Sequence, residues 1–485
     1  MKRLLTVGVG LVWGLGACTI GPEYVKPSPP PSSAFKETAS QPGSPDWKKS
    51  TPRDDVLRGQ WWLIYADPEL SKLEEQAGPA NQTLKLAEAN MRRARTLVTY
   101  SRASRLPTVT TSSYYSDGRA SPNAPSQNVK AKPARDWGQD FNLSFEFSYE
   151  IDFWGRVRRS IAASQAQAQA SVADLETARL SIHSEIAIDY FELRAADAEK
   201  ALLEITVTAY RRALELVKAR AREGIAPKSD ISQAETQLDA ALVQTTEIAI
   251  ARGRYEHALA VLIGKPPSEF ALAERPLDAK PPLLPQIPTG LPSALLERRP
   301  DIAALERRMA AANEQIGLAE IAYYPTVNLA ALVGVESTSV SSLFNWPSRL
   351  WAVGPMVSQT LFDGGRRRAT SEAAQANYEA TVAEYQQTAL DSFQQVEDNL
   401  LALRVLREEV RQQHETTVAA KETYRLFQAR YQEGADTYLQ VVTAETNALE
   451  NQRHDIDLLR RQCLAHVALV KALGGGWDSG SLPKF

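Results

Sequence analysis

The chain is poor in cysteine, with only Cys18 and Cys463 among its 485 residues. So few cysteines exclude a disulfide framework and a paired Cys-x-x-Cys site. Outside residues 4–17, the sequence also lacks any run close to the roughly 20 consecutive apolar residues of a membrane-spanning helix. Contact with the core of a membrane would therefore have to come from β-strands or from an attached lipid.

The chain also has little excess charge and none of the common catalytic motifs. Its net charge of -3 leaves no basic surplus for binding nucleic acid. There is no G-x-S-x-G, H-E-x-x-H or P-loop motif, so an enzyme is disfavoured and neither a cofactor nor a metal site is expected. The histidines are scattered along segments expected to be helical, where surface or interhelix positions explain them: His183, His257, His414, His454 and His466.

The N-terminus has the pattern of an export signal. Lys2 and Arg3 precede an apolar stretch that ends in Leu15-Gly16-Ala17-Cys18. This ending resembles a bacterial lipobox, which implies that Cys18 is the first mature residue and carries a covalent lipid. An ordinary signal with an incidental cysteine is the alternative, but it does not explain a cysteine directly after Leu-Gly-Ala. Thr19 stands where an aspartate would resemble an inner membrane retention signal, so the outer membrane is the expected destination.

The two halves of the chain repeat each other. Motifs recur 210 residues apart, namely Gly155-Arg156 with Gly365-Arg366, Glu223-Gly224 with Glu433-Gly434, Ala234-Glu235-Thr236 with Ala444-Glu445-Thr446, and Gly264 with Gly474. Pro107-Thr108-Val109 matches Pro325-Thr326-Val327 at an offset of 218, so the first half has eight extra residues, which we place in the stretch 116–138. We therefore expect one structural unit to occur twice.

Each repeat contains a stretch of 68 residues without glycine or proline, 156–223 and 366–433. These stretches are rich in good helix formers, so each predicts one continuous helix of roughly 100 Å. Gly224 and Gly434 are expected to end the two helices, and return helices should follow at 228–263 and 435–473. Segments 81–105 and 301–324 can stack on the return helices and so complete the return of the chain along the long helices. Cys463 then has the role of a small apolar residue inside a helix.

Between these helices the sequence predicts strands. From Phe141 to Phe153, aromatic or aliphatic residues alternate strictly with polar ones, as in a barrel strand that faces lipid on one side. Weaker alternation occurs at 327–335 and 351–361, and 108–116 is the weakest of the four. A half-buried strand of a soluble sheet is a reasonable alternative for these three only. Four strands cannot close a barrel, which needs about eight, so oligomers are required. Three chains would give twelve strands.

The chain resembles the outer membrane factor (TolC-like) channels, in particular the lipoprotein branch that serves resistance-nodulation-division pumps. Five groups of residues carry the resemblance, in this order: Cys18 with Gly21-Pro22-Glu23-Tyr24; Trp61-Trp62 with Asp67-Pro68-Glu69-Leu70; Arg298-Arg299-Pro300-Asp301-Ile302 with Glu306; Leu361-Phe362-Asp363-Gly364-Gly365-Arg366; and Ala472-Leu473-Gly474-Gly475-Gly476-Trp477. The resemblance covers nearly the whole chain.

The resemblance implies an α+β membrane protein, a homotrimer with a 12-stranded β-barrel continuous with a long periplasmic α-helical barrel. It further implies a passive exit channel for small toxic molecules, with a periplasmic adaptor, an inner membrane transporter and outer membrane lipid of a Gram-negative bacterium as partners. A type I protein secretion duct is the nearest alternative, and a structural coiled-coil protein leaves the alternation of residues 141–153 unexplained. The expected segments are 1–17 (signal peptide), 18–60 (lipid-anchored extended segment), 61–106 (equatorial and upper helices), 107–155 (first transmembrane hairpin), 156–263 (first helical hairpin), 264–299 (linker), 300–324 (upper helix), 325–365 (second transmembrane hairpin), 366–473 (second helical hairpin) and 474–485 (tail).

The family's periplasmic gate can be carried over residue by residue. The acid six residues after the first hairpin glycine is Asp230, and the tyrosine three residues before the second is Tyr431. Asp436 stands where the best-known member has an arginine, and Gln440 and Thr443 stand where acids are common. We expect a hydrogen bond between Asp230 and Tyr431 to hold the closed state. Its alternative is that Asp230 merely caps the return helix.

Other residues complete the predicted channel. Arg430 can offset the charge of Asp436, and Tyr438 and Leu439 can add apolar packing to the closed end. The adaptor-contacting tips are expected at Gly224, Ile225, Ala226, Gly434, Ala435 and Thr437. On the polar face of the barrel strand, Glu146, Glu150 and Asp152 would line the lumen and favour cations, unless arginine or lysine side chains pair with them.

Overall fold

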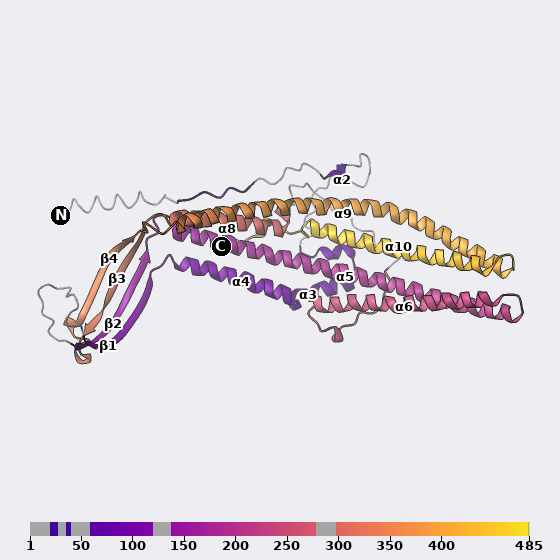
Figure 1. Cartoon of the computed structure of the whole chain (residues 1–485), viewed down its shortest axis with the longest axis horizontal. Helices are drawn as coiled ribbons and strands as arrows, with labels where there is room; N and C mark the ends of the chain where they lie inside the picture. Colours follow the sequence, from indigo (N-terminus) through magenta and orange to yellow (C-terminus); the bar gives the residue numbers. More distant parts are fainter. Residues whose placement is uncertain (1–19, 28–34, 40–58, 120–136, 278–296, 484) are drawn as a thin grey trace.

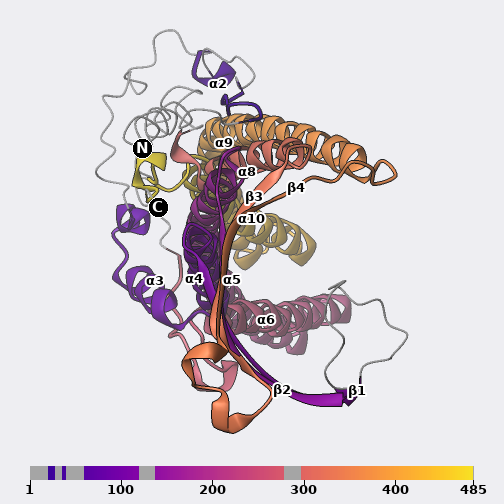
Figure 2. The ribbon, with the colours of Figure 1, turned by 90° about the vertical axis from the view of Figure 1, so that its left-hand side faces the viewer.

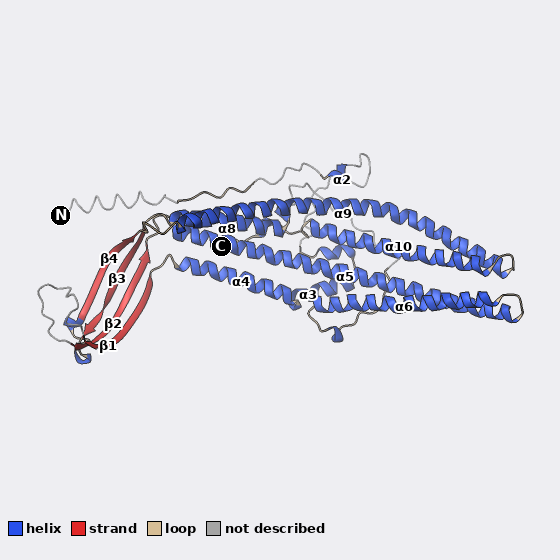
Figure 3. Ribbon diagram, in the orientation of Figure 1, coloured by secondary structure: helices blue, strands red, loops and turns tan. Residues whose placement is uncertain are grey.

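The computed structural model of the chain describes residues 20–27, 35–39, 59–119, 137–277, 297–483 and 485. These residues form an elongated molecule. A sheet lies at one end, long helices run along the length, and the turns that connect the helices of two hairpins lie at the other end (Figure 1). The strands and the long helices occupy separate regions in the described part, and short helices lie at the far end of the sheet (Figure 3). The predicted signal peptide and Cys18 lie outside the described residues.

Four antiparallel strands form the sheet, in the order β1 (Thr108–Arg119), β2 (Trp137–Glu150), β3 (Thr326–Ser337) and β4 (Arg349–Ser358). The register aligns Phe145 with Val333, and Val333 with Trp351. All three side chains are largely exposed in the single chain, on one apolar face. The next row places Glu146 between Thr110 and Leu332 on the other face. The four predicted strands are therefore confirmed, and they alternate as expected.

The main error in the strand prediction is the end of β2. The strand starts earlier than predicted, at Trp137, and stops at Glu150, so Ile151 and Phe153 lie beyond it. The amide of Phe153 bonds the carbonyl of Ile151 in a turn that leads into the next helix. The amide of Ile151 still bonds the carbonyl of Val327 in β3 at 2.9 Å, and the chain turns directly after it. A strict alternation of side chains does not reveal where the strand ends. Residues 120–136, which belong to the stretch predicted to contain the eight extra residues, lie outside the described residues.

Two helical hairpins carry the rest of the length. Hairpin 1 consists of α5 (Arg156–Arg222) and α6 (Lys228–Leu262), and hairpin 2 of α9 (Arg366–Gln432) and α10 (Tyr438–Ala472). The long helices have 67 residues each and the return helices 35 each. Every boundary of hairpin 1 recurs 210 residues later in hairpin 2. The prediction that the second return helix begins at Ala435 is wrong by three residues, because Thr437 has extended backbone angles and serves as the N-cap.

Shorter helices complete the two columns. Helix α4 (Gln82–Ala103) continues the column of α6, and α8 (Pro300–Ile321) that of α10 (Figure 1). Helix α5 packs against α4, α6, α8 and α10, whereas α9 packs against α8 and α10 (Figure 2). The remaining described helices are α2 (Lys36–Ala39), η2 (Trp61–Tyr65), α3 (Pro68–Ala80), η3 (Pro267–Glu269), η4 (Val340–Ser342), η5 (Trp346–Ser348) and η6 (Ser479–Ser481). No helix in the described part is both long and apolar enough to span a bilayer.

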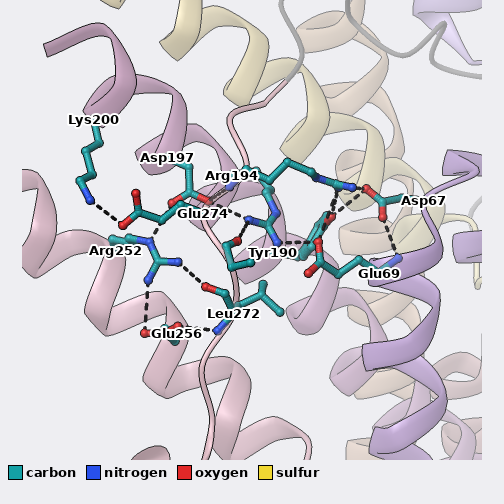
Figure 4. A network of polar contacts seen from close by, with 12 residues as sticks. Asp67, Glu69, Tyr190, Arg194, Asp197, Lys200, Arg252, Glu256, Leu272 and Glu274 are labelled. Carbon is teal, nitrogen blue, oxygen red and sulfur yellow. Dashed lines mark hydrogen bonds and ion pairs between the residues drawn. The ribbon is translucent and has the colours of Figure 1, made fainter. Parts of the chain in front are cut away.

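A buried polar network fixes α3 and the linker 272–275 against hairpin 1 (Figure 4). Arg194 of α5, which is 1% exposed, bonds both Asp197 and Glu69 at 2.7 Å. Arg252 of α6 reaches Asp197 at 2.7 Å and donates to the carbonyl of Leu272. Because buried charges are costly unless they are fully paired, this network defines the position of the linker tightly.

Two of the motifs that carry the family resemblance pack against each other. Arg299, before α8, pairs with Asp301 and donates to the carbonyl of Ala472 at the end of α10. Gly474 has a φ of +89°, and a Cβ there would lie 2.2 Å from the carbonyl oxygen of Arg298. Only glycine fits this close approach. These contacts join the start of the upper column to the end of hairpin 2.

Candidate functional site

The two hairpin turns lie side by side at the end of the molecule remote from the sheet (Figure 1). Gly224 and Gly434 adopt φ angles of +72° and +78°, which end α5 and α9 as predicted. The six residues predicted to contact an adaptor all lie in these turns, and Ile225 is 64% exposed. These six positions therefore present glycine, small residues and one exposed aliphatic side chain, beside the exposed acids Glu223 and Glu433.

The predicted hydrogen bond between Asp230 and Tyr431 is not present in this chain. Tyr431 is 6% exposed, and its buried hydroxyl has no hydrogen-bond partner. Burial raises the pKa of Tyr431, Arg220 opposes that shift, and Asp230 adds to it, so the carboxylate is nearby without a bond to the phenol. Asp230 occupies the first turn of α6, where a negative charge also stabilises the helix N-terminus.

The residue that contacts Tyr431 instead is Arg220 of α5, which the sequence interpretation missed. Its guanidinium carbon lies 4.6 Å from the centre of the Tyr431 ring. It donates a hydrogen bond of 2.9 Å to the backbone carbonyl of Tyr431. On its other side the Tyr431 ring packs against Tyr438, with 5.5 Å between ring centres. The repeat could have pointed to Arg220. This residue occupies the position equivalent to Arg430, which was proposed to offset the charge of Asp436.

The charge of Asp436 is neutralised within its own hairpin. Arg430 pairs with Asp436 at 2.6 Å, so Asp436 does not stand unpaired beside Asp230. Of the two residues that replace family acids, Gln440 is exposed and Thr443 donates to a carbonyl of its own helix. The expected apolar packing is only half present, because Tyr438 is 3% exposed whereas Leu439 is 55% exposed.

A buried carboxyl lies above the turns and was not predicted. Glu445 of α10 is 6% exposed and lies among tyrosines from three helices: Tyr210, Tyr424 and Tyr438. Burial raises the pKa of Glu445 to about 7, although a hydrogen bond with Tyr424 opposes the shift. The sequence alone could not predict this burial, because Glu235 occupies the equivalent position of hairpin 1 and yet is exposed and pairs with Lys218.

Arginines neutralise two of the three acids predicted to line the lumen. Glu150, the last residue of β2, pairs with Arg156 at the start of α5. Asp152 lies beyond the strand and accepts the backbone amide of Val157 at 2.9 Å, while its other oxygen pairs with Arg158. Both acids therefore stabilise the first turn of α5, and the alternative that arginines pair with the predicted lumen acids holds for two of the three. Glu146 is left on the polar face, within 3.5 Å of the Ser112 hydroxyl.

The predicted residues thus separate into two groups at opposite ends of the molecule. The turns, Tyr431, Asp230 and Asp436 gather at the helical end, while Glu146, Glu150 and Asp152 lie at or near the sheet (Figure 1). Among the described residues, no group of three or more histidine, cysteine or acidic side chains is placed to hold a metal ion. At the helical end, noncovalent contacts between side chains hold the two hairpins together.

Comparison with known proteins gives a consistent match. Residues 73–265 and 291–475 match the family model described as outer membrane efflux protein. The chain is 30% identical to outer membrane protein OprJ of Pseudomonas aeruginosa over 96% of this chain and 94% of that protein. It is 29% identical to the toluene efflux pump outer membrane protein TtgF of Pseudomonas putida, over 98% and 97% of the two chains. Among solved structures, the outer-membrane channel OprN superposes with a TM-score of 0.85 at 28% identity, over 95% of this chain and 100% of that one.

Proposed function

The chain belongs to the outer membrane efflux protein family, and from this premise we propose that three copies form the lipid-anchored exit duct of a tripartite efflux pump. It is an outer membrane channel of the kind that efflux pumps use, and its relatives serve the export of small toxic compounds such as toluene. The duct is passive, because the energy comes from an inner membrane transporter of the resistance-nodulation-division type. A periplasmic adaptor joins the two.

The sheet provides the main support for a trimer. Among the described residues, its outer strands, β1 and β4, each have one edge without a neighbouring strand. An open edge beside an exposed apolar face is unfavourable in lipid, because its backbone groups lack hydrogen-bond partners. Pairing β4 of one copy with β1 of the next satisfies these groups and gives a closed barrel of twelve strands. Exposed aliphatic side chains on α9, such as Leu401 and Val405, provide the matching contact along the helices.

The lipid anchor is supported by the path of the residues that follow Cys18. The amide of Ile20 bonds the carbonyl of Trp154 at the junction between sheet and helices. Arg159, which is buried, donates to the carbonyl of Ile20 at 2.6 Å, and Tyr24 donates to Glu306 at 2.7 Å. A lipid on Cys18, two residues before Ile20, would therefore start beside the membrane end of the helices. Mass spectrometry of the mature N-terminal peptide tests this, and an unmodified Cys18 would refute it.

The proposed function can be tested by reconstitution. The purified chain should run as a trimer and conduct ions in planar bilayers, and deletion of its gene should sensitise cells to small toxic compounds. An Ile225→Asp change at the exposed tip should keep the trimer but lower efflux, because it removes an apolar contact for the adaptor. A chain that stays monomeric and forms no channel would contradict the proposal.

A further inference from the structure

The two hairpins of one chain are joined at their tips by Arg220. Its side chain is half-buried between hairpin 1, to which it belongs, and the end of α9 in hairpin 2. It stacks on the Tyr431 ring and donates to the carbonyl of Tyr431, with the carbonyl of Gln432 at 3.5 Å. Its Nε is buried and has no hydrogen-bond partner, so the hydrogen bonds found for this guanidinium go to hairpin 2.

These contacts suit the end of a helix. The last carbonyls of α9 carry the negative end of the helix dipole. The Tyr431 carbonyl already accepts the amide of Gly434 at 3.0 Å, and a carbonyl can accept a second hydrogen bond, which Arg220 donates while it lies over the negative face of the Tyr431 ring. The contact is therefore favourable only while the tips of the two hairpins stay together.

The repeat shows that this arrangement belongs to one hairpin only. Arg430 corresponds to Arg220, since the two are 210 residues apart and each lies four residues before its turn glycine. Arg430 bends back to Asp436 in its own turn. The residue that corresponds to Asp436 in hairpin 1 is Ala226, which has no charge. Arg220 thus has no counterpart of Asp436 in its own turn, and its hydrogen bonds reach across to hairpin 2.

We propose that Arg220 is a positioning residue of the gate, a clasp on the Tyr431 ring and carbonyl that holds the two hairpin tips together in the closed state. The proposal rests on the proposed channel function and adds a residue to its gate. It also changes the role of Tyr431. In the clasp the ring and the backbone carbonyl act, and the hydroxyl, which has no partner, is dispensable.

Conductance and entry of a large antibiotic provide the test, with trimer stability measured on the same samples. Arg220→Ala should open the channel, with roughly a tenfold shift in the ratio of closed to open states for the loss of one cation–π contact and its hydrogen bond. Arg220→Lys should lie between the alanine variant and the wild type, because an ammonium keeps the charge but not the flat stacking. Tyr431→Leu should be leaky, whereas Tyr431→Phe should stay closed. The double variant Arg220→Ala with Tyr431→Leu should be no leakier than either single change.

The control shares the fold but not the clasp. Arg222→Ala removes an exposed arginine two residues away on the same helix. This variant should remain closed. A closed Arg220→Ala channel, or equal leakage from Arg222→Ala, would overturn the clasp, as would leakage from Tyr431→Phe. If Arg220→Ala does not assemble, the lysine and Tyr431 variants decide the matter. Failure of the wild type to conduct at all would instead reject the proposed function.

Discussion

Helices α5 and α9 are counterparts in the repeat, with equal lengths and boundaries 210 residues apart, yet they are buried very differently. In α5, 27 side chains are buried within the chain, against eight in α9. The reason is position, because α5 is covered mainly by α4, α6, α8 and α10, with α3 in addition, whereas α9 is covered mainly by α8 and α10. A duplicated sequence unit has therefore produced one helix for the core of the chain and one for its edge. An edge helix with exposed aliphatic residues is suited to contact a neighbouring copy.

The largest effect on stability is expected when one pair of equivalent residues in α5 and α9 is replaced by alanine, one residue at a time. Phe191 of α5 is 4% exposed, and its counterpart Leu401 of α9 is 40% exposed. Phe191→Ala should cost about 3–5 kcal/mol, because it leaves a cavity in the core. Leu401→Ala should barely change the folding of the chain but should weaken the trimer. Thermal unfolding by circular dichroism and the survival of trimers on heating measure the two effects, and equal losses in both assays would contradict the division into core and edge.

The second comparison concerns Glu445 and Glu235, which occupy equivalent positions in the two hairpins. The raised pKa of Glu445, about 7 against an ordinary 4.5, means that its protonated form is favoured in the folded chain. Its contribution to stability is complete below about pH 4.5 and is lost as the pH rises through 7, by on the order of 2–3 kcal/mol. Glu445→Gln should remove this part of the pH dependence.

The matched control for Glu445 is Glu235→Gln. Glu235 is exposed, so the control variant should keep the wild-type profile. Unfolding temperatures between pH 5 and pH 8 give the comparison. A wild type and a Glu445→Gln variant with parallel profiles would show that the burial of Glu445 has no energetic consequence.

A smaller effect is expected at the sheet, where β2 carries Glu146 and Glu150. Glu146→Gln should lower the preference for cations, whereas Arg156→Ala should raise it by freeing Glu150, each by roughly twofold because rings of acids attract cations. On β4 the same face carries Ala352 and Met356, which have no charge. Reversal potentials in a salt gradient measure the preference. Unchanged values in both variants would argue that this face does not line the lumen.

The smallest effect should follow from Asp436→Ala. Its partner Arg430 is 60% exposed, and surface ion pairs contribute less than about 1 kcal/mol. The variant should unfold nearly like the wild type and remain closed. A leaky Asp436→Ala channel would show that Arg430, once it has lost Asp436, disrupts the contact between Arg220 and Tyr431. The two turns would then act together in closing the channel.

Much of this architecture follows from the sequence because its signals are local. Residues 156–222 form a helix since no glycine or proline interrupts good helix formers, and Gly224 ends it because glycine readily adopts a positive φ. The alternation around Phe145 likewise predicts a strand with two different faces. The offset of 210 predicts that the unit occurs twice. All of these features depend on neighbours in the sequence.

The partners of individual side chains depend instead on which helices meet. Glu150 and Asp152 look like free lumen acids in the sequence, but the junction with α5 brings Arg156 and Arg158 to them. Arg220 and Arg430 have equivalent places in the repeat, yet one turns to its own hairpin and the other crosses to Tyr431. Glu445 and Glu235 differ in the same way, because only one is covered by neighbouring helices. The sequence determined the elements, and tertiary packing decided which charges are paired, buried or left to act, since those outcomes arise from residues that can lie 282 positions apart.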